Sequence, residues 1–173
     1  EIGKFPEMLG NADASTAFAR QCSNLLVYID TMQKPVIAAV NGLALGGGLE
    51  IAIRCHSIVA SKNASFQFPE ITLGILPGIG GCVVPYRKWP QAATVFHEML
   101  RFGKPIKVQE AQNIGMVKKV ADDYFTMIKA AIEEVNHLQG KIQRIPDGKI
   151  AIAPIQPVET PMAGKLALSR EAV

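Results

Sequence analysis

The sequence predicts an α/β fold, because short apolar segments alternate with a helix between residues 34 and 60. Residues 36–40 form an apolar, partly β-branched run, which is typical of a strand covered on both faces. A glycine triplet at residues 46–48 follows and opens a helix predicted over residues 49–54. A second buried strand is predicted over residues 57–60. Strand, glycine turn, helix and strand make a βαβ-like unit, which indicates an α/β fold.

A long helix is predicted ahead of this unit, over residues 13–32, after a loop at residues 1–12. Its apolar residues recur at spacings of four, three, four and three, which defines one helix face. That face comprises Phe18, Cys22, Leu25, Ile29 and Met32. The candidates for its N-terminal cap are Asn11, Asp13 and Ser15.

The remaining elements follow from similar signals. A glycine-rich turn at residues 76–81 is expected to enter a helix. Further helices are predicted over residues 90–102 and 108–114, and short strands over 65–68 and 117–120. A last helix is predicted between Asp122-Asp123, which favour a helix start, and Gly140, which favours a helix end. Its inner face is expected to comprise Tyr124, Ile128, Ala131, Val135 and Leu138.

The composition changes beyond Ile145, where four prolines fall between residues 146 and 161. Such a segment is typical of an extended or polyproline-like chain rather than a packed element. We therefore expect a core over residues 1–145 and a proline-rich tail over residues 146–173.

Length and composition indicate a globular protein and exclude some partners. A chain of 173 residues, 49% of them hydrophobic, suits one domain or part of a larger one. The net charge of +3 is not concentrated in basic runs with aromatics, so we expect no nucleic acid partner. The apolar runs are too short to span a membrane, so we expect no membrane partner. Cys22, Cys55 and Cys82 are widely spaced, which is typical of reduced thiols in a cytoplasmic protein.

The glycine triplet is a candidate site for binding an anionic oxygen. Backbone N–H groups at a helix N-terminus lack an intrahelical acceptor and lie at the positive end of the helix dipole. Glycine lets a substrate approach that backbone without meeting a Cβ atom. Gly46, Gly47 and Gly48 meet both requirements. The alternative is a tight strand-to-helix connection in which the glycines serve packing only.

Two glutamates near this turn are candidates for acid–base chemistry. Glu50 falls in the first turn of the predicted helix, and Glu70 follows the apolar segment Phe66-Gln67-Phe68-Pro69. An apolar setting raises the pKa of a carboxyl group, which suits a general acid or base near neutral pH. The alternatives are that Glu50 only complements the helix dipole and that Glu70 is a solvated loop residue.

Other chemistries find little support in the sequence. The glycines match neither GxGxxG after a strand nor GxxxxGK[ST], so dinucleotide and P-loop sites are not predicted. His56, His97 and His137 lack the spacing of metal ligands. We therefore expect neither a metal nor a bound cofactor.

Residues 34–120 resemble the crotonase (enoyl-CoA hydratase/isomerase) superfamily in one collinear run. The matching pieces include Lys34-Pro-Val-Ile-Ala-Ala-Val-Asn-Gly42, Ala44-Leu-Gly-Gly-Gly48, Glu50, Pro69-Glu-Ile71, Pro77-Gly78, Gly80-Gly81 and Gly115-Met-Val117. The resemblance implies a crotonase-like spiral of ββα units. It also implies that this family's coenzyme A is part of an acyl-CoA thioester substrate rather than a cofactor.

The resemblance further implies roles for the candidate residues. Gly47 matches the family glycine whose N–H forms part of the oxyanion hole, with Gly46 and Gly48 beside it. Glu50 and Glu70 match the acid–base pair that adds water to a trans-2-enoyl-CoA. Family isomerases generally keep the equivalent of Glu70 and lose the other, so the pair favours a hydratase in fatty-acid or related acyl-CoA β-oxidation. Enoyl-CoA isomerase remains an alternative.

The sequence departs from the family pattern in several places. The family's second oxyanion donor lies in an Ala-Gly-Ala-Asp-like loop, and the chain begins at Glu1-Ile-Gly3, about where that loop ends. This implies a core incomplete at its N-terminus and leaves a non-catalytic, acyl-CoA-binding or oligomerising fragment as another alternative. His56 stands where family members commonly have Asp, and Gln67-Phe68 stand where they have Gly-Gln. Cys82-Val-Val-Pro85 stands where Thr-Gln-Arg-Leu is usual. These replacements are expected to affect rate and substrate range more than reaction type.

The resemblance also implies partners. Family members form homo-oligomers, trimers or dimers of trimers, and the same is expected here. The tail, from Pro154 onwards, resembles the end of fused enzymes that join a 3-hydroxyacyl-CoA dehydrogenase to a C-terminal hydratase. A dehydrogenase domain upstream of this chain is therefore a further expectation.

Overall fold

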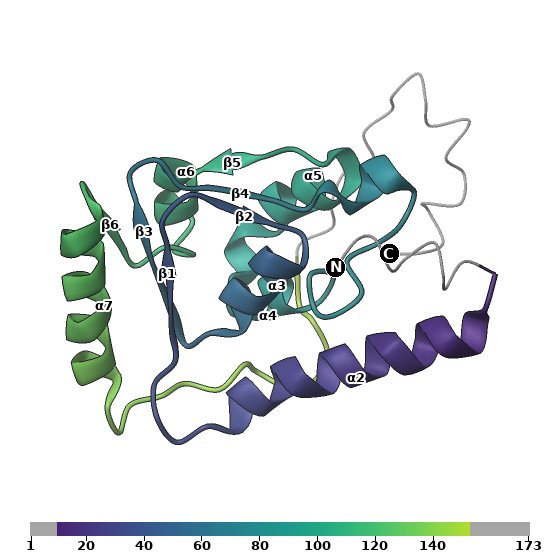
Figure 1. Ribbon diagram of the computed structural model, residues 1–173, viewed down its shortest axis with the longest axis horizontal. Helices are drawn as coiled ribbons and strands as arrows, with labels where there is room; N and C mark the ends of the chain where they lie inside the picture. Colours follow the sequence, from purple (N-terminus) through teal and green to yellow (C-terminus); the bar gives the residue numbers. More distant parts are fainter. Residues whose placement is uncertain (1–9, 153–173) are drawn as a thin grey trace.

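The computed structural model describes residues 10–152, which form two small sheets with helices around them (Figure 1). The first sheet is parallel, in the order β1 (Ile37–Val40), β3 (Ser57–Ser61) and β6 (Lys119–Ala121). The second has the order β2 (Leu43–Leu45), β4 (Ser65–Gln67) and β5 (Ile106–Lys107). In it β4 runs parallel to β2 and antiparallel to β5.

The chain contributes to both sheets in turn. β1 and β2 are consecutive and lie in different sheets, and α3 (Gly47–Arg54) follows them. β3 and β4 repeat this arrangement and lead into the 3-10 helix η2 (Pro69–Leu73). The predicted α/β class and the spiral of ββα units are therefore confirmed.

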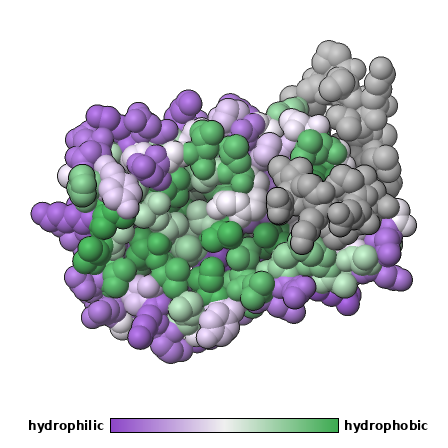
Figure 2. All heavy atoms as spheres, in the orientation of Figure 1, coloured by the Kyte–Doolittle hydropathy of each residue, from purple (hydrophilic) through white to green (hydrophobic). Residues whose placement is uncertain are grey.

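The other helices surround the sheets. They are α2 (Ala12–Thr31), α4 (Val84–Lys88), α5 (Ala93–Phe102), α6 (Val108–Asn113) and α7 (Tyr124–Leu138), with a short 3-10 helix η3 (Pro90–Ala92). α7 packs across all three strands of the first sheet, and α2 contacts α3 (Figure 1). Large apolar side chains also reach the surface, and Figure 2 shows them gathered in the central area of the face turned to the viewer.

The main hydrophobic core fixes α3 in place. Leu49 and Ile53, one turn apart on that helix, are fully enclosed together with Phe66, Phe68 and Phe96. Burial of each such side chain contributes about 1.5–3 kcal/mol. A smaller cluster of Val59, Ala121, Met127 and Ala130 joins the first sheet to α7. α3 is thus packed against the main core along its buried face.

The first predicted helix is confirmed, and its predicted inner face is confirmed in part, because Cys22, Ile29 and Met32 are half-buried. Asn11 is the cap, since its side-chain oxygen accepts a hydrogen bond from the Ala14 N–H at 3.0 Å. Leu26 is buried at 8% exposure, whereas the predicted Leu25 is 68% exposed. α2 lies against α3 along a narrow stripe, so the apolar spacing alone did not determine which residues face inward.

The inner face of α7 is confirmed in part, because Ile128 and Ala131 pack partly buried against the smaller core cluster. Met127 and Ala130 are buried and Tyr124 is exposed. Packing of α7 on Val59 and Ala121 of the sheet selects this stripe. The predicted start is confirmed, because Asp123 and Thr126 form a reciprocal capping box.

Other predictions need smaller corrections. β2 and β5 were not expected, because strands of three and two residues carry too little pattern to identify them. The strand predicted at 117–120 lies at Lys119–Ala121, and a 3-10 turn occupies the first three residues of the helix predicted at 90–102. The three cysteines are free thiols, as expected. None of the helices in residues 10–152 has the length and apolar character to cross a membrane.

The first residues of the predicted tail agree with the prediction in their secondary structure but not in their packing. Residues 146–152 form no helix or strand, as expected for an extended segment. Ile150 and Ile152 nevertheless pack against the main core, which corrects the expectation of an unpacked tail there. The core boundary at residue 145 stays a prediction, and the resemblance that begins at Pro154 lies outside the described residues.

Candidate active site

The glycine triplet forms the N-terminal end of α3. Gly46 caps the helix with a positive φ of 50°, donates its N–H to the Gln67 carbonyl at 3.0 Å and accepts from the Glu50 N–H at 2.9 Å. Gly47 and Gly48 occupy the first two helical positions, where backbone N–H groups have no intrahelical acceptor. The predicted arrangement of a strand, a glycine turn and exposed helix-end donors is present.

Glycine is required at position 46 by a close approach. A Cβ atom there would lie 3.0 Å from Oε1 of Glu70, and the positive φ would be strained for any other residue. A Cβ atom at Gly48 would meet open space, and one at Gly47 would touch only Ile79 at 4.0 Å. The packing explanation therefore accounts for Gly46 but not for Gly48.

Glu50 is buried at 3% exposure, in the first turn of α3. Its Oε1 accepts hydrogen bonds from the Ile79 N–H at 2.9 Å and the Gly81 N–H at 2.8 Å. Burial raises the pKa of Glu50, and these backbone donors and the Arg54 charge oppose that rise without cancelling it. A mere partner for the helix dipole would not be enclosed in this way.

Glu70 is buried at 9% exposure in η2, against the expectation of a solvated loop residue. Its Oε1 faces Gly46, and its Oε2 is enclosed without a hydrogen-bond partner among residues 10–152. Burial raises the pKa of Glu70, and the nearby charge of Glu50 raises it further. An unsatisfied buried carboxylate oxygen is costly, so it is retained most readily where a ligand or water completes it.

The loop that binds Glu50 was not identified as part of the site from the sequence. Its glycines suggested a turn before a helix, but not that Ile79 and Gly81 would donate to a carboxylate 29 and 31 residues away. Gly81 is required here because a Cβ atom would lie 2.6 Å from Pro77 Cβ and 2.8 Å from Phe68 Cε1. The ring of Phe68 therefore packs directly against the loop at Gly81.

The other departures from the family pattern have distinct surroundings. Cys82 borders the site, since the charges of Glu50 and Glu70 add to burial in raising the pKa of its thiol. Its Sγ donates to the Pro77 carbonyl at 3.5 Å. His56 lies at the opposite end of α3, where its Nδ1 accepts from the Val36 N–H at 2.8 Å. We therefore connect Cys82, and not His56, with the glutamates.

Residues 10–152 contain no candidate metal site, because no group of three or more His, Cys, Asp and Glu side chains converges there. Two neighbouring cavities of about 320 and 310 Å³ share His56, Lys118, Glu134 and Gln143 in their walls, and neither is lined by Glu50 or Glu70. The glutamates therefore form a separate group at the other end of α3.

Comparison with known proteins identifies the family. The family described as enoyl-CoA hydratase/isomerase matches residues 3–146, so the chain belongs to it. A probable enoyl-CoA hydratase of Bacillus subtilis is 37% identical over 131 residues, covering 76% of this chain and 50% of that protein. A glyoxysomal fatty acid beta-oxidation multifunctional protein of Cucumis sativus is 41% identical over 93 residues, covering 53% of this chain and 12% of that protein.

Solved structures agree on the crotonase fold. An enoyl-CoA hydratase structure from Bacillus anthracis superposes with a TM-score of 0.67 at 30% identity, covering 77% of this chain and 51% of that chain. The chain thus spans about half the length of the hydratases it matches, and one-eighth or so of the multifunctional protein.

Proposed function

We propose that the protein containing this chain hydrates trans-2-enoyl-CoA thioesters to 3-hydroxyacyl-CoA. The observation that carries the proposal is the pairing of two buried glutamates at the N-terminal end of α3, one with an unpartnered oxygen. Membership of the enoyl-CoA hydratase/isomerase family supports the substrate class. An isomerase would need only Glu70, whereas the enclosed geometry of Glu50 favours a reaction that uses both residues.

In the proposed reaction, the two carboxyl groups hold a water molecule whose oxygen attacks the β carbon of the enoyl thioester. Glu50 accepts the proton that the water loses, and protonated Glu70 donates its proton to the α carbon. The Gly47 N–H stabilises the negative oxygen of the enolate formed between these steps. Transfer of a proton from Glu50 to Glu70 then restores both groups for the next turnover. Burial raises both carboxyl pKa values, which is the direction that suits carboxyl groups acting as proton donors and acceptors. Coenzyme A enters as part of the substrate, and the reaction needs no other cofactor.

A finer proposal concerns the cellular context. The printed name of the cucumber relative contains fatty acid beta-oxidation, which supports this pathway for the present chain. That relative is multifunctional, which is compatible with a dehydrogenase domain joined to this one. A cytoplasmic homo-oligomer stays our expectation from the sequence, and light scattering on the intact protein would measure its size.

Turnover of crotonyl-CoA by the intact protein tests the function, measured as loss of the ultraviolet absorbance of the conjugated enoyl thioester. Glu50→Gln and Glu70→Gln should each lower kcat by about 10²–10⁴-fold, because each removes a proton-transfer group. Glu98→Gln, at an exposed ion pair with Lys104, is the matched control and should retain wild-type kcat.

Wild-type rates in both glutamine variants would overturn the assignment. Conversion of a 3-enoyl-CoA to its 2-enoyl isomer that survives Glu50→Gln but not Glu70→Gln would instead identify an isomerase. Binding of acyl-CoA without turnover of either substrate by the intact protein would favour the non-catalytic alternative.

A further inference from the structure

We propose that Arg54 is a positioning residue for Glu50, and that Asp30 of α2 holds Arg54 in that role. Arg54 follows Glu50 by four residues on α3, so the two side chains project from the same face one turn apart. The kinetic part of the inference rests on the proposed function, whereas the structural part does not.

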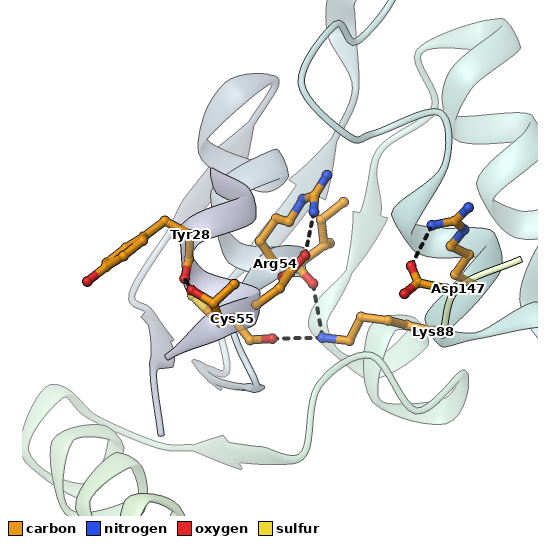
Figure 3. A network of polar contacts seen from close by, with 9 residues as sticks. Tyr28, Arg54, Cys55, Lys88 and Asp147 are labelled. Carbon is orange, nitrogen blue, oxygen red and sulfur yellow. Dashed lines mark hydrogen bonds and ion pairs between the residues drawn. The ribbon is translucent and has the colours of Figure 1, made fainter. Parts of the chain in front are cut away.

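Arg54 is anchored by one short ion pair between helices. Its Nη1 lies 2.7 Å from Oδ2 of Asp30, and the two side chains are only 12% and 20% exposed. Figure 3 shows the Arg54 side chain with this ion pair drawn as a dashed line. Within the described part of the chain, Asp30 Oδ1 and Arg54 Nε are buried without hydrogen-bond partners, so the contact is made through a single nitrogen and a single oxygen.

The guanidinium lies against the loop that binds Glu50. A Cβ atom at Gly80 would be 3.2 Å from Arg54 Nε and 3.3 Å from Nη2, and Gly80 has a φ of +142° that disfavours other residues. The residues on either side of Gly80, Ile79 and Gly81, donate their N–H groups to Glu50. The loop is therefore enclosed between the carboxylate that it binds and the guanidinium of Arg54.

Charge adds to this contact. The positive charge of Arg54 lowers the pKa of Glu50 and so opposes the larger effect of burial. The other ionisable groups near Glu50 in the described part of the chain are Glu70 and Cys82, which also respond to its charge. Because Asp30 lies against Arg54, we expect it to offset part of the Arg54 charge that acts on Glu50.

The experiment compares Arg54→Met, Arg54→Lys and Asp30→Asn in the intact protein. The ionisation midpoint of Glu50 is read from carbon-13 resonances of labelled glutamate side chains, assigned with Glu50→Gln. The kinetic readout is the pH profile of kcat/KM for crotonyl-CoA. Arg20→Met, at an exposed arginine of α2, is the matched control and should change neither readout.

The two charge removals should act in opposite directions. Arg54→Met should raise the Glu50 midpoint, move the acidic limb of the pH profile to higher pH and lower kcat about tenfold through a misplaced loop. Asp30→Asn should lower the midpoint, because it leaves the positive charge of Arg54 less compensated. Arg54→Lys should restore the midpoint toward wild type without restoring kcat, because an ammonium cannot lie flat along the loop.

General destabilisation would not produce shifts of opposite sign. Unchanged Glu50 midpoints in Arg54→Met and Asp30→Asn would overturn the inference, as would equal shifts of the same sign. If Arg54→Met fails to fold, the directions in Asp30→Asn and Arg54→Lys still decide it. An intact protein that lacks hydratase activity would refute the proposed function, while the resonance titration would still test the role of Arg54.

Discussion

The N-terminal end of α3 faces two carboxyl groups, whereas its C-terminal end faces a lysine and a histidine. Burial raises the pKa values of Glu50 and Glu70 at the first end. At the second end it lowers the pKa of Lys88 to about 8 and also lowers that of His56. In each case burial favours the neutral form of the group. A shifted pKa therefore does not by itself distinguish the two ends.

Hydrogen bonding does distinguish them. Lys88 Nζ donates to the carbonyls of Ile53 and Cys55 at 2.9 and 2.7 Å (Figure 3). The same nitrogen lies 4.7 Å from the centre of the Trp89 ring. These carbonyls belong to the end of α3, where cations are favoured. Glu70 Oε2, in contrast, has no partner, and the first N–H groups of α3 have no intrahelical acceptor. Protein carbonyls therefore accept hydrogen bonds from Lys88, whereas a carboxylate oxygen and backbone N–H groups beside the glutamates are available to hydrogen-bond a ligand.

Among the variants that test this difference between the two ends of α3, Gly46→Ala at the N-terminal end is expected to have the largest effect. The added Cβ would lie 3.0 Å from Glu70 Oε1 and would impose a strained positive φ, which costs about 1–3 kcal/mol. Displacement of Glu70 should lower kcat by about tenfold or more. Crotonyl-CoA hydration and thermal unfolding measure the two consequences.

Gly42→Ala is the matched control, because a Cβ there meets nothing within 4 Å and no positive φ is required. It should keep wild-type kcat. A Gly46→Ala variant that is equally active would show that Glu70 tolerates displacement, and the contrast between the two ends of α3 would lose its basis.

A smaller effect, on stability, is expected from Lys88→Met at the C-terminal end. Loss of the donor leaves two carbonyls unsatisfied, which should cost about 1–3 kcal/mol at neutral pH. Because the folded pKa is lowered from 10.5 to about 8, the unfolded state binds more protons between these values, and the wild type gains stability as pH rises through them.

The methionine variant lacks this gain, so its deficit should widen by up to about 1 kcal/mol for each pH unit above 8. Urea unfolding at pH 7, 8 and 9 checks the trend. The kcat value at neutral pH should remain near that of the wild type. A large loss of kcat in a folded Lys88→Met variant would contradict the division between a catalytic end and a structural end.

The smallest effect is expected on the stability of Glu70→Gln. The folded pKa of Glu70 is raised above the usual value of 4.5, so the folded state binds the proton more tightly. The stability of the wild type therefore falls as pH rises from about 4.5 through the folded pKa. Glutamine does not ionise, so the variant should be more stable than wild type at pH 7 and equally stable near pH 4.

Glu133→Gln supplies a control of opposite sign for this measurement. The hydrogen bond from Lys119 lowers the pKa of Glu133, so its loss should destabilise the protein slightly at neutral pH and not in acid. If both variants respond to pH in the same direction, burial is not the cause of the behaviour of Glu70.

Sequence signals were most reliable where a structural feature depends on neighbouring residues. The helix start at the glycine triplet and the place of Glu50 in its first turn follow from spacing within one helical turn. The caps at Asn11 and Asp123 and the left-handed Gly103 after α5 follow from local hydrogen bonding and backbone freedom. Local spacing did not decide what Gly47, Glu50 and Glu70 do, and their proposed catalytic roles came from the resemblance to a known family.

Tertiary structure alone decided which distant groups meet. It turned Leu26 rather than Leu25 inward, paired Asp30 with Arg54, and seated Glu70 Oε1 against Gly46. It also placed the Ile79 and Gly81 N–H groups on Glu50. These contacts depend on how two sheets and their connecting loops pack, and no residue in them signals its partner along the chain. The sequence by itself thus determined the helix end and the carboxyl groups available to it, whereas packing determined their burial, their charge balance and the oxygen left unsatisfied.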